Sequence, residues 1–370
     1  MKDFESTIIT PNLKVNLLNF DLRTMKKFFV SIGEKEFRAQ QVMKWIYQYY
    51  CDDFRKMTNI TIQLRQKLSA LCSITPPIFR HQQNSFDGTI KWSVSIGNKF
   101  IETVCIPQNK RTTLCISSQL GCSLSCNFCS TGQQKFNKNL SVSEIIGQIW
   151  YVQKLIYFSK LNFIGKITNV VMMGMGEPLL NFSNVVRALK IMLDNSGFNM
   201  SKHHITLSTA GVAPALKKLS TMIDVSLAVS LHASNDIIRN KLMPINRKYN
   251  IQTLLEAVKE YLNHTSSNRG RVTIEYVMLN NINDKPSHAE ELVFLLKSIP
   301  NKINLIPWNY FSGSNYICST KLRINNFFNI LVKKGCIVTI RKIRGDDINA
   351  ACGQLSGIII NKEFSKKIII

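Results

Sequence analysis

Six apolar, strand-like runs constrain the fold of this chain more than any other feature. They are TLCIS, NVVMMGM, HITLSTAG, VSLAVSLH, VTIEYVML and INLIPWN, at residues 113–117, 169–175, 204–211, 225–232, 272–279 and 303–309. Runs that are apolar on both faces are typical of parallel strands covered by helices. Six such units favour a partial or full barrel over an open sheet, and the sequence leaves closure undecided. We therefore predict an α/β fold with a barrel core over residues 111–355.

A helix signal follows the first run. Ser141 and Glu144 have the S-x-x-E spacing of a capping box, in which each side chain accepts a hydrogen bond from the other residue's backbone N–H. Apolar residues recur behind it at helical spacing, at Val142, Ile145, Ile146, Ile149 and Val152. The pattern predicts an amphipathic helix that starts directly after Ser141.

The segments before the core differ from it in pattern. Residues 23–72 carry apolar residues at helical spacing, which predicts several short helices in an accessory domain over residues 1–85. From Asp87, an Asp-Gly turn and a Gly-Asn turn among β-prone residues predict a β hairpin that bridges the two domains, over residues 86–110. Residues 356–370 are left as a C-terminal tail.

The charge of the chain points to a polyanionic partner. It has 47 lysines and arginines against 23 acidic residues, a net charge of +24. We expect RNA, because a basic excess of this size suits a phosphate backbone. Codon bias towards lysine, asparagine and isoleucine is the plain alternative. A membrane surface would call for a basic amphipathic helix, which we do not find.

The sequence also favours a reducing compartment. No apolar run follows a basic segment at the start, and no stretch of about 20 apolar residues occurs. We expect a cytoplasmic protein without a membrane segment. Ten cysteines in that compartment favour metal binding or catalysis over a disulfide framework.

Polar or reactive residues follow five of the six predicted strands at their carboxyl ends, where barrel enzymes place their active sites. A cysteine loop follows the first strand and a Gly-Met-Gly-Glu-Pro turn the second, and the other three positions are Ser208, His232 and Asn309. Core packing explains each polar residue singly, but it explains less easily why all lie at equivalent ends. We predict that they form one site.

Three cysteines stand close together in GCSLSCNFCS, at Cys122, Cys126 and Cys129. A structural zinc site needs a fourth ligand, and the nearest histidine downstream is His203. The CxxxCxxC spacing instead suits three irons of a 4Fe–4S cluster, whose fourth iron stays open to a substrate or cofactor. Structural zinc is thus a strained alternative.

This loop, with Phe128 just before its third cysteine, resembles that of the radical S-adenosylmethionine (SAM) enzymes. Longer motifs resemble the RlmN family of dual-specificity RNA methyltransferases, which methylate C2 of adenosine. They are LCISSQLGCSLSCNFCSTGQQKFNKNLSVSEIIGQ, NVVMMGMGEPLLN, ITLSTAGV, SLAVSLHA, GRVTIEYVMLNNIND, INLIPWN and RKIRGDDINAACGQL. The match runs from about Gly88 to Leu355. Departures are few: Gly132 stands where many members have alanine, and Ser234 where many have proline.

The resemblance implies a radical SAM partial (β/α)6 barrel with a small helical accessory domain that binds RNA and a short β bridging segment. It implies that Cys122, Cys126 and Cys129 bind a 4Fe–4S cluster and that SAM takes the open iron. The positions that hold SAM are matched by Gly176, Glu177, Ser208, Ser230, Leu231, His232 and Asn309. Taken alone, His232 would more often be an ordinary core histidine.

The resemblance also implies a route to an electron-poor carbon. The family methylates its own cysteine with one SAM, and a radical from a second SAM then activates that methyl group for addition to C2. Cys352 matches the methyl carrier, Cys115 the resolving thiol that forms a transient disulfide with it, and Glu102 the proton acceptor. Cys115 is a rival proton acceptor, and burial or strand position is an ordinary alternative for all three.

The implied partners are 23S rRNA near the peptidyl-transferase centre, tRNA beside the anticodon, and an electron-donor protein of flavodoxin type. We expect a monomer. Two other functions stay open. A C8-adenosine methyltransferase of the resistance type shares nearly every motif, and a non-catalytic RNA-binding protein would use the three cysteines for a structural metal.

Overall fold

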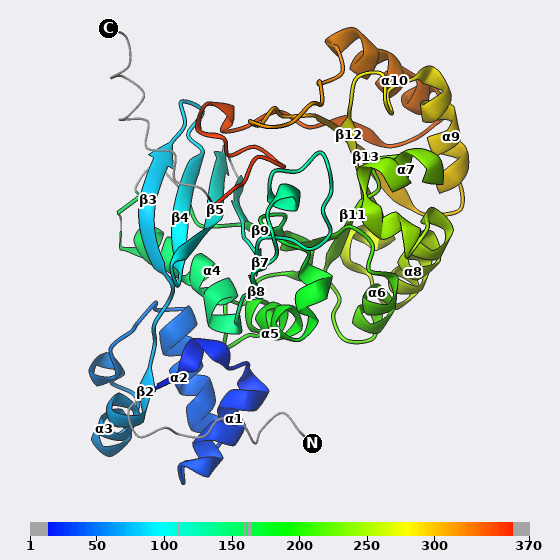
Figure 1. Ribbon diagram of the computed structural model, residues 1–370. Helices are drawn as coiled ribbons and strands as arrows, with labels where there is room; N and C mark the ends of the chain where they lie inside the picture. The colour runs from blue at the N-terminus through cyan, green and yellow to red at the C-terminus, as the bar shows by residue number, and fades with distance from the viewer. Residues whose placement is uncertain (1–13, 110, 159, 162–164, 358–370) are drawn as a thin grey trace, which may run out of the picture. The chain divides into compact units, whose positions relative to one another are not determined.

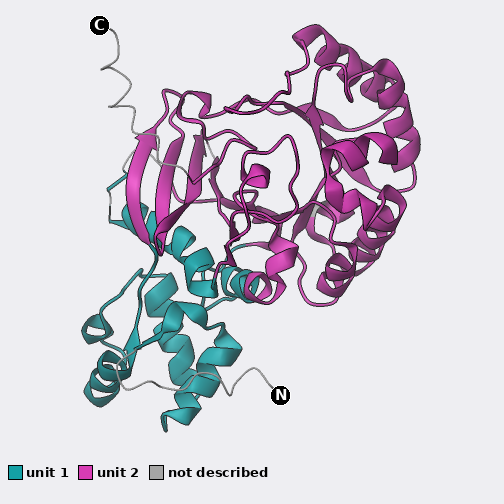
Figure 2. Cartoon of the chain, in the orientation of Figure 1, with its two compact units in different colours: residues 1–77, 141–162, 187–200 teal, residues 78–140, 163–186, 201–370 magenta. Residues whose placement is uncertain are grey.

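The chain forms two compact units, shown in different colours in Figure 2. The computed structural model describes residues 14–109, 111–158, 160–161 and 165–357. Unit 1 comprises residues 1–77, 141–162 and 187–200, and unit 2 comprises residues 78–140, 163–186 and 201–370. Each unit contains segments that are separate in the chain, and none of these segments ends at a predicted boundary. The domain boundaries at 85, 110 and 355 therefore stay predictions.

Unit 1 is mainly helical, as the sequence predicts for its N-terminal part. Its elements are β1 (Val15–Asn16), η1 (Leu17–Asn19), α1 (Leu22–Ser31), α2 (Phe37–Tyr47), η2 (Phe54–Lys56), α3 (Ile62–Leu71), β2 (Cys72–Ser73) and α4 (Val142–Tyr157). The predicted capping box is present: the Ser141 N–H donates to Glu144 Oε2 over 2.8 Å, and the Glu144 N–H donates to Ser141 Oγ over 3.3 Å. The five predicted apolar residues of α4 are buried, which confirms the amphipathic helix.

Unit 2 is built on one ten-stranded sheet. Its strands are β3 (Ile78–Asn84), β4 (Ile90–Ile96), β5 (Lys99–Gln108), β6 (Arg111–Cys115), β9 (Asn169–Met172), β10 (Ile205–Thr209), β11 (Ser226–Ser230), β12 (Val272–Met278), β13 (Asn301–Pro307) and β14 (Val338–Ile340). They lie in the order β14-β13-β12-β11-β10-β9-β6-β5-β4-β3. All six predicted strands are present and pair in parallel, from β6 to β13. The sheet ends at β14 and β3 without closing, so the barrel is partial.

Helices cover the outer side of the curved parallel strands (Figure 1). They are α6 (Ala213–Ser220), α7 (Asp236–Leu242), α8 (Ile251–His264), α9 (Pro286–Leu296) and α10 (Lys321–Lys333), while α5 (Phe182–Leu193) is divided between the two units. The short 3-10 helices are η3 (Thr131–Gln133), η4 (Pro178–Asn181), η5 (Lys202–His204), η6 (Pro244–Arg247), η7 (Ser267–Gly270) and η8 (Asp346–Ile348). A second small sheet pairs β7 (Gln119–Leu120) with β8 (Lys138–Asn139).

Two strands of the large sheet are not anticipated by the sequence, and both lie at its edges. β3 is polar and mostly exposed, and β14 has three residues, none of them buried. An edge strand that faces water lacks the apolar alternation from which strands are predicted. β3 pairs with β4 and β5 pairs with β6, so the predicted hairpin is a three-stranded antiparallel segment continuous with the parallel sheet.

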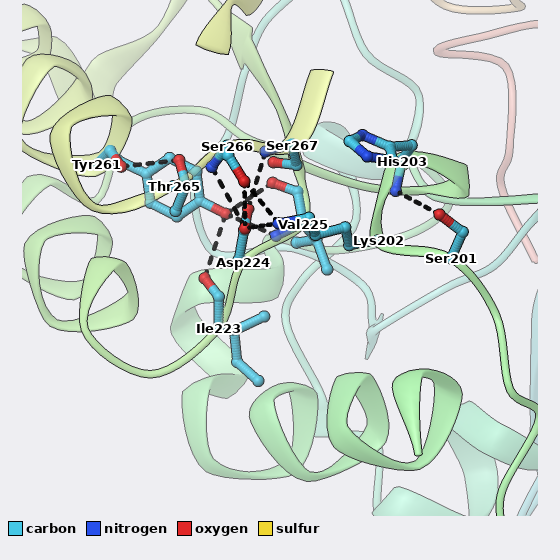
Figure 3. Close-up of polar contacts among 10 residues, drawn as sticks. All are labelled: Ser201, Lys202, His203, Ile223, Asp224, Val225, Tyr261, Thr265, Ser266 and Ser267. Carbon is cyan, nitrogen blue, oxygen red and sulfur yellow. Dashed lines mark hydrogen bonds and ion pairs between the residues drawn. The ribbon is translucent and has the colours of Figure 1, made fainter. Parts of the chain in front are cut away.

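The amino ends of three parallel strands are tied together by Asp224 (Figure 3). Its carboxylate accepts hydrogen bonds from the Lys202 ammonium and from the backbone N–H groups of Ser266 and Ser267, over 3.2 and 3.0 Å for the two amides. Partial burial raises the pKa of Asp224, but these donors outweigh that effect and lower it to about 2. The Tyr261 hydroxyl donates to the neighbouring Val225 carbonyl over 2.7 Å. This network stabilises the face of the barrel opposite the strand ends that carry the predicted site.

Candidate active site

The carboxyl ends of the parallel strands surround a cavity of about 150 Å³ in unit 2. We call it the first cavity. Most of the predicted site residues line it, namely Cys122, Cys126, Cys129, Gly176, Glu177, Ser208, Ser230, His232, Asn309 and Cys352. Leu231 is buried without lining it, and Cys115 and Glu102 lie outside its wall. Most of the residues that the strand-end pattern predicts for one site therefore do lie together in the structure.

The cysteine loop is held by its backbone. Gly121 has φ +76°, and a Cβ there would collide with the backbone across the loop, so glycine is required. The Asn127 N–H donates to the Leu242 carbonyl over 3.1 Å, and its amide Nδ2 donates to the Lys241 carbonyl over 2.8 Å. Both carbonyls belong to the last turn of α7, which thus serves as a platform for the loop.

The three loop thiols influence one another. Burial raises the pKa of Cys122 to about 12, and the nearby charges of Glu177 and Cys129 add to this. Burial raises the pKa of Cys126 well above its ordinary value, and Cys129 and Cys122 reinforce the shift. Because the three thiols are buried close together, their thiolates would repel one another. All three can ionise together only if a cation binds between them.

This donor set fits an iron–sulfur cluster better than a single ion. Among the described residues, no three His, Cys, Asp or Glu side chains converge closely enough to hold one metal ion. A cubane cluster spreads three thiolate ligands over three irons, and its positive core would stabilise the thiolates that burial disfavours. Cys122, Cys126 and Cys129 are therefore the residues able to hold such a group.

The turn after β9 is shaped for close approach. Gly176 has φ +93°, and a Cβ there would collide with the Gln119 side chain. Glu177 next to it is buried, and its carboxylate accepts hydrogen bonds from Thr209 Oγ1 and the Ala210 N–H, both over 2.7 Å. Burial raises the pKa of Glu177 while these donors oppose the rise. The carboxylate thus ties the turn to the end of β10, besides facing the cavity.

His232 and Asn309 present polar atoms on the cavity wall. His232 Nδ1 accepts a hydrogen bond from the Val277 N–H over 3.0 Å, which leaves the proton of the neutral ring on Nε2. Burial, aided by the charge of Arg239, lowers the pKa of His232 to about 3 and keeps the ring neutral. Asn309 Oδ1 is buried and has no hydrogen-bond partner. A buried acceptor without a donor indicates a place for a ligand that donates a hydrogen bond.

Cys352 and Cys115 come together around a guanidinium. Arg341 and Cys352 line the same cavity wall, and the charges of Cys352, Glu275 and Cys115 together raise the pKa of Arg341 against its burial. Cys115 is buried at the end of β6, where burial and then the nearby Cys352 raise its pKa to about 12. The two thiols predicted to act in sequence are thus neighbours in space.

The segment that carries Cys352 is fastened to the cysteine loop. The Ser130 N–H donates to the Gly353 carbonyl over 2.8 Å, and Thr131 Oγ1 donates to the Leu355 carbonyl over 2.6 Å. Asn309 Nδ2 donates to the Cys352 carbonyl over 3.2 Å. These bonds hold the Cys352 sulfur against the first cavity.

Glu102 holds the same segment from the other side. Its carboxylate forms a buried ion pair with Lys91 over 2.9 Å and accepts the backbone N–H groups of Ser356 and Gly357 over 2.7 and 3.0 Å. In this structure the carboxylate is engaged with the chain and lies outside the cavity walls. Its predicted role as a proton acceptor stays a prediction.

A second cavity of about 350 Å³ shares part of its wall with the first. The shared residues are Met173, Glu275, Ile306, Asn309, Arg341 and Cys352. Its cationic residues are Arg111, Lys302, Arg341, Lys342 and Arg344, against one acidic residue, Glu275. Partial burial and the charge of Arg341 lower the pKa of Arg111, and Arg344 Nε is buried without a partner. Like charges crowded around a space favour an anionic occupant.

Sequence reasoning missed two arginines of this site. Arg341 was inside a quoted motif, RKIRGDDINAACGQL, but received no role. Arg239 is fully buried and donates to the carbonyls of Ser230 and Leu231 over 3.1 Å each. Its only signal was its place on a helix after the fourth predicted strand, because burial of an arginine cannot be read from its type.

Comparisons with known proteins identify the family of this chain. Residues 15–74 match the family model for the ribosomal RNA large subunit methyltransferase N-terminal domain, and residues 116–293 match the model for the radical SAM superfamily. A curated relative from Buchnera aphidicola subsp. Baizongia pistaciae, described as dual-specificity RNA methyltransferase RlmN, is 74% identical over 99% of this chain and 98% of its own length. The chain belongs to the RlmN family.

Further relatives support this assignment. A protein of the same description from Buchnera aphidicola subsp. Acyrthosiphon pisum is 57% identical over 95% of this chain and 96% of its own. The crystal structure of a radical SAM methyltransferase from Sphaerobacter thermophilus aligns with a TM-score of 0.85 and 35% identity, over 93% of this chain and 100% of that one. These matches confirm the predicted radical SAM fold, and the superfamily implies a 4Fe–4S cluster and SAM. No helix in the described part of the chain is long and apolar enough to span a bilayer.

Proposed function

We propose that this RlmN-family protein methylates C2 of adenosine in 23S rRNA, in the peptidyl-transferase region, and in tRNA beside the anticodon. The methyl group passes through an S-methylcysteine at Cys352, and each turnover uses two SAM molecules. The observation that carries the proposal is that Cys352 and Arg341 lie at the wall shared by the two cavities, within electrostatic reach of the buried Cys115. A carrier thiol that is released by a second thiol needs both at one place.

In this proposal Cys122, Cys126 and Cys129 hold the 4Fe–4S cluster and the first cavity holds SAM. When bound, the cluster and SAM supply a one-electron cleavage that generates the hydrogen-abstracting radical. The proposed SAM-binding residues are Gly176, Glu177, Ser208, Ser230, Leu231, His232 and Asn309. The partnerless Oδ1 of Asn309 and the tight turn at Gly176 support this use of the first cavity.

The chain's own side chains would then divide the remaining work. Arg341 stabilises negative charge on the Cys352 sulfur while that sulfur accepts a methyl group. After transfer to C2, Glu102 or Cys115 takes the C2 proton. The Cys115 thiolate then attacks the Cys352 sulfur, which forms the S–S bond and breaks the bond from sulfur to the methyl-derived carbon. That carbon keeps the electron pair and takes a proton to become the methyl group, and the one unpaired electron of the adduct would return to the oxidised cluster. Cellular thiols reopen the disulfide.

The RNA would enter through the second cavity, where its phosphates meet the cationic wall. We assign residues 1–85 as an accessory RNA-binding domain, 86–110 as the bridging β segment, 111–355 as the catalytic core and 356–370 as a tail. The match of residues 15–74 to an rRNA methyltransferase domain supports the first of these. The protein would act in the cytoplasm as a monomer and take electrons from a donor protein of flavodoxin type.

An anaerobic assay tests this function. Protein reconstituted with iron and sulfide is incubated with SAM, a reductant and either 23S rRNA fragments or tRNA, and the RNA is digested to nucleosides. We expect 2-methyladenosine by mass spectrometry against authentic standards. 8-Methyladenosine would instead indicate the resistance-type reaction. Zinc in place of iron, with RNA bound but no SAM cleaved, would indicate a non-catalytic RNA-binding protein.

A further inference from the structure

Arg239, on α7, is a fully buried cation without an acidic partner. Its guanidinium donates to the carbonyls of Ala210, Ser230 and Leu231 over 2.7, 3.1 and 3.1 Å, and to Asn246 Oδ1 over 2.7 Å. All four acceptors are neutral. Among the described residues, no carboxylate forms an ion pair with this side chain. A buried cation that contacts no counter-charge is costly. An anion bound close to Arg239 would therefore stabilise it.

Asp236, on the same helix, is the natural candidate for a counter-charge, but it is engaged elsewhere. Its Oδ1 accepts hydrogen bonds from Asn246 Nδ2 over 2.7 Å and from the Ile251 N–H over 3.0 Å. It therefore caps neighbouring segments at the start of α7. Asn246 bridges the two side chains and the charge of Asp236 opposes the fall that burial causes in the pKa of Arg239, but the carboxylate makes no direct ion pair with the guanidinium, which donates to the ends of β10 and β11.

The cysteine loop is bound to the same helix as Arg239. The last turn of α7 accepts two hydrogen bonds from Asn127, between Cys126 and Cys129. The charge of Arg239 also reaches Cys126, because it counters the rise that burial causes in the pKa of that thiol. Burial lowers the pKa of Arg239 to about 10, which leaves it cationic at neutral pH. One short helix thus positions the loop and places a permanent positive charge behind its second cysteine.

We propose that Arg239 is the counter-cation of the cluster held by Cys122, Cys126 and Cys129, and that it favours the reduced cluster. Three thiolates give the cluster a net negative charge, and one electron from an external reductant makes that charge more negative. A nearby buried cation stabilises the reduced form more than the oxidised one and so raises the reduction potential. Arg239 is a positioning residue as well, because the N–H groups of its guanidinium hold the carbonyls of Ser230 and Leu231 beside the proposed SAM site.

This inference rests on the proposed cluster but not on the proposed RNA chemistry. The test uses full-length protein reconstituted anaerobically, with Arg239→Met and Arg239→Lys variants. Methionine removes the charge and keeps much of the volume, whereas lysine keeps the charge and loses the fork. The cluster midpoint potential is measured by redox titration monitored by electron paramagnetic resonance, and SAM affinity by equilibrium binding. Neither measurement depends on which carbon of adenosine is methylated.

We expect the midpoint potential of Arg239→Met to move to a more negative value and that of Arg239→Lys to stay near the parent. SAM affinity should fall in both variants, because neither has the guanidinium that holds the carbonyls of Ser230 and Leu231. The control is Arg323→Met. Arg323 lies on α10 and pairs with Asp284 over 3.0 Å, and its removal should leave the midpoint potential unchanged. An unchanged potential in Arg239→Met would overturn the proposal. If the methionine variant does not fold, Arg239→Gln takes its place as the variant without the charge. Equal midpoint potentials in Arg239→Lys and Arg239→Gln would then overturn the proposal as well.

Discussion

The charge of Arg341 reaches both the Cys352 and the Cys115 thiol. One cation therefore acts on both sulfur atoms that the proposed reaction joins in a disulfide. Arg341 lines the wall of both cavities together with Cys352 and Glu275, and the carboxylate of Glu275 also contributes to the raised pKa of the guanidinium.

Loss of Arg341 should slow the first methyl transfer. A nearby cation favours the thiolate, which is the nucleophilic form of a cysteine, so we expect Arg341→Met to lower the rate of S-methylation of Cys352 by about 10-fold. Arg341→Lys should recover part of the rate, since it keeps the charge but not the fork. The methyl group is measured on the Cys352 peptide by mass spectrometry, without RNA. A rate equal to that of the parent would show that the guanidinium does not act on this sulfur.

The two cysteines should fail at different stages. Cys352→Ala should abolish RNA methylation while RNA binding persists. Cys115→Ala should instead accumulate a covalent protein–RNA adduct, because methyl transfer proceeds but the carrier cannot be released. The adduct is detected as a nuclease-sensitive shift in denaturing gels. Cys105→Ala is the matched control, since Cys105 is a buried strand cysteine that lines neither cavity. Normal methylation by Cys352→Ala would disprove the carrier mechanism.

Release of the RNA should accelerate with pH. Burial raises the pKa of Cys115 to about 12, so the thiolate is scarce at neutral pH and its fraction grows about tenfold for each pH unit below that value. Decay of the adduct in a single-turnover experiment should therefore speed up between pH 7 and pH 9. A rate independent of pH in that window would mean that Cys115 is already ionised or is not the attacking group.

Glu102 can be tested as a base and as a structural residue in one experiment. Glu102→Gln leaves Lys91 buried without its partner, which should destabilise the protein by about 3–5 kcal/mol in denaturant unfolding. The double variant Lys91→Met/Glu102→Gln removes the unpaired charge and should regain much of that stability. If the carboxylate is the proton acceptor, methylation stays lost in the double variant. Recovered methylation would assign Glu102 a purely structural role.

The second cavity should contribute to RNA affinity. Arg111→Gln and Arg344→Gln should each weaken RNA binding at all sequences and reduce the slope of log affinity against log salt by about 1, as expected for one lost phosphate contact. Lys217→Gln is the control, because Lys217 pairs with Glu260 over 3.4 Å on the helical exterior of the barrel. Unchanged salt slopes in both arginine variants would place the phosphates elsewhere.

The sequence predicted the parts of this fold that bury apolar surface in a regular pattern. The six parallel strands and the capped helix α4 follow from runs and spacing, and the resemblance of several long motifs to RlmN added the candidate functional residues, which stay predictions. The two edge strands escaped because β3 is exposed and polar and β14 is very short. No periodicity distinguishes such segments from loops.

For the site, residue type indicated the candidate cluster ligands but not the residues that support them. Cysteines at metal-ligand spacing stand out in a sequence, whereas a buried arginine such as Arg239 looks like any surface arginine. The engagement of Glu102 with Lys91 and the backbone beyond Cys352 also depends on contacts between residues far apart in the chain. Such contacts follow from the tertiary fold and have no local signature.

The bond from Thr131 to the Leu355 carbonyl joins residues 224 positions apart. During synthesis the cysteine loop leaves the ribosome long before its partner does, so the pocket around the thiols stays open until the later segment has folded onto it. If the three thiols bind a cluster as proposed, insertion would have its easiest access in that interval. Assembly of the proposed metal centre and completion of the fold would then be coupled in time, and the segment that carries Cys352 would also close the site.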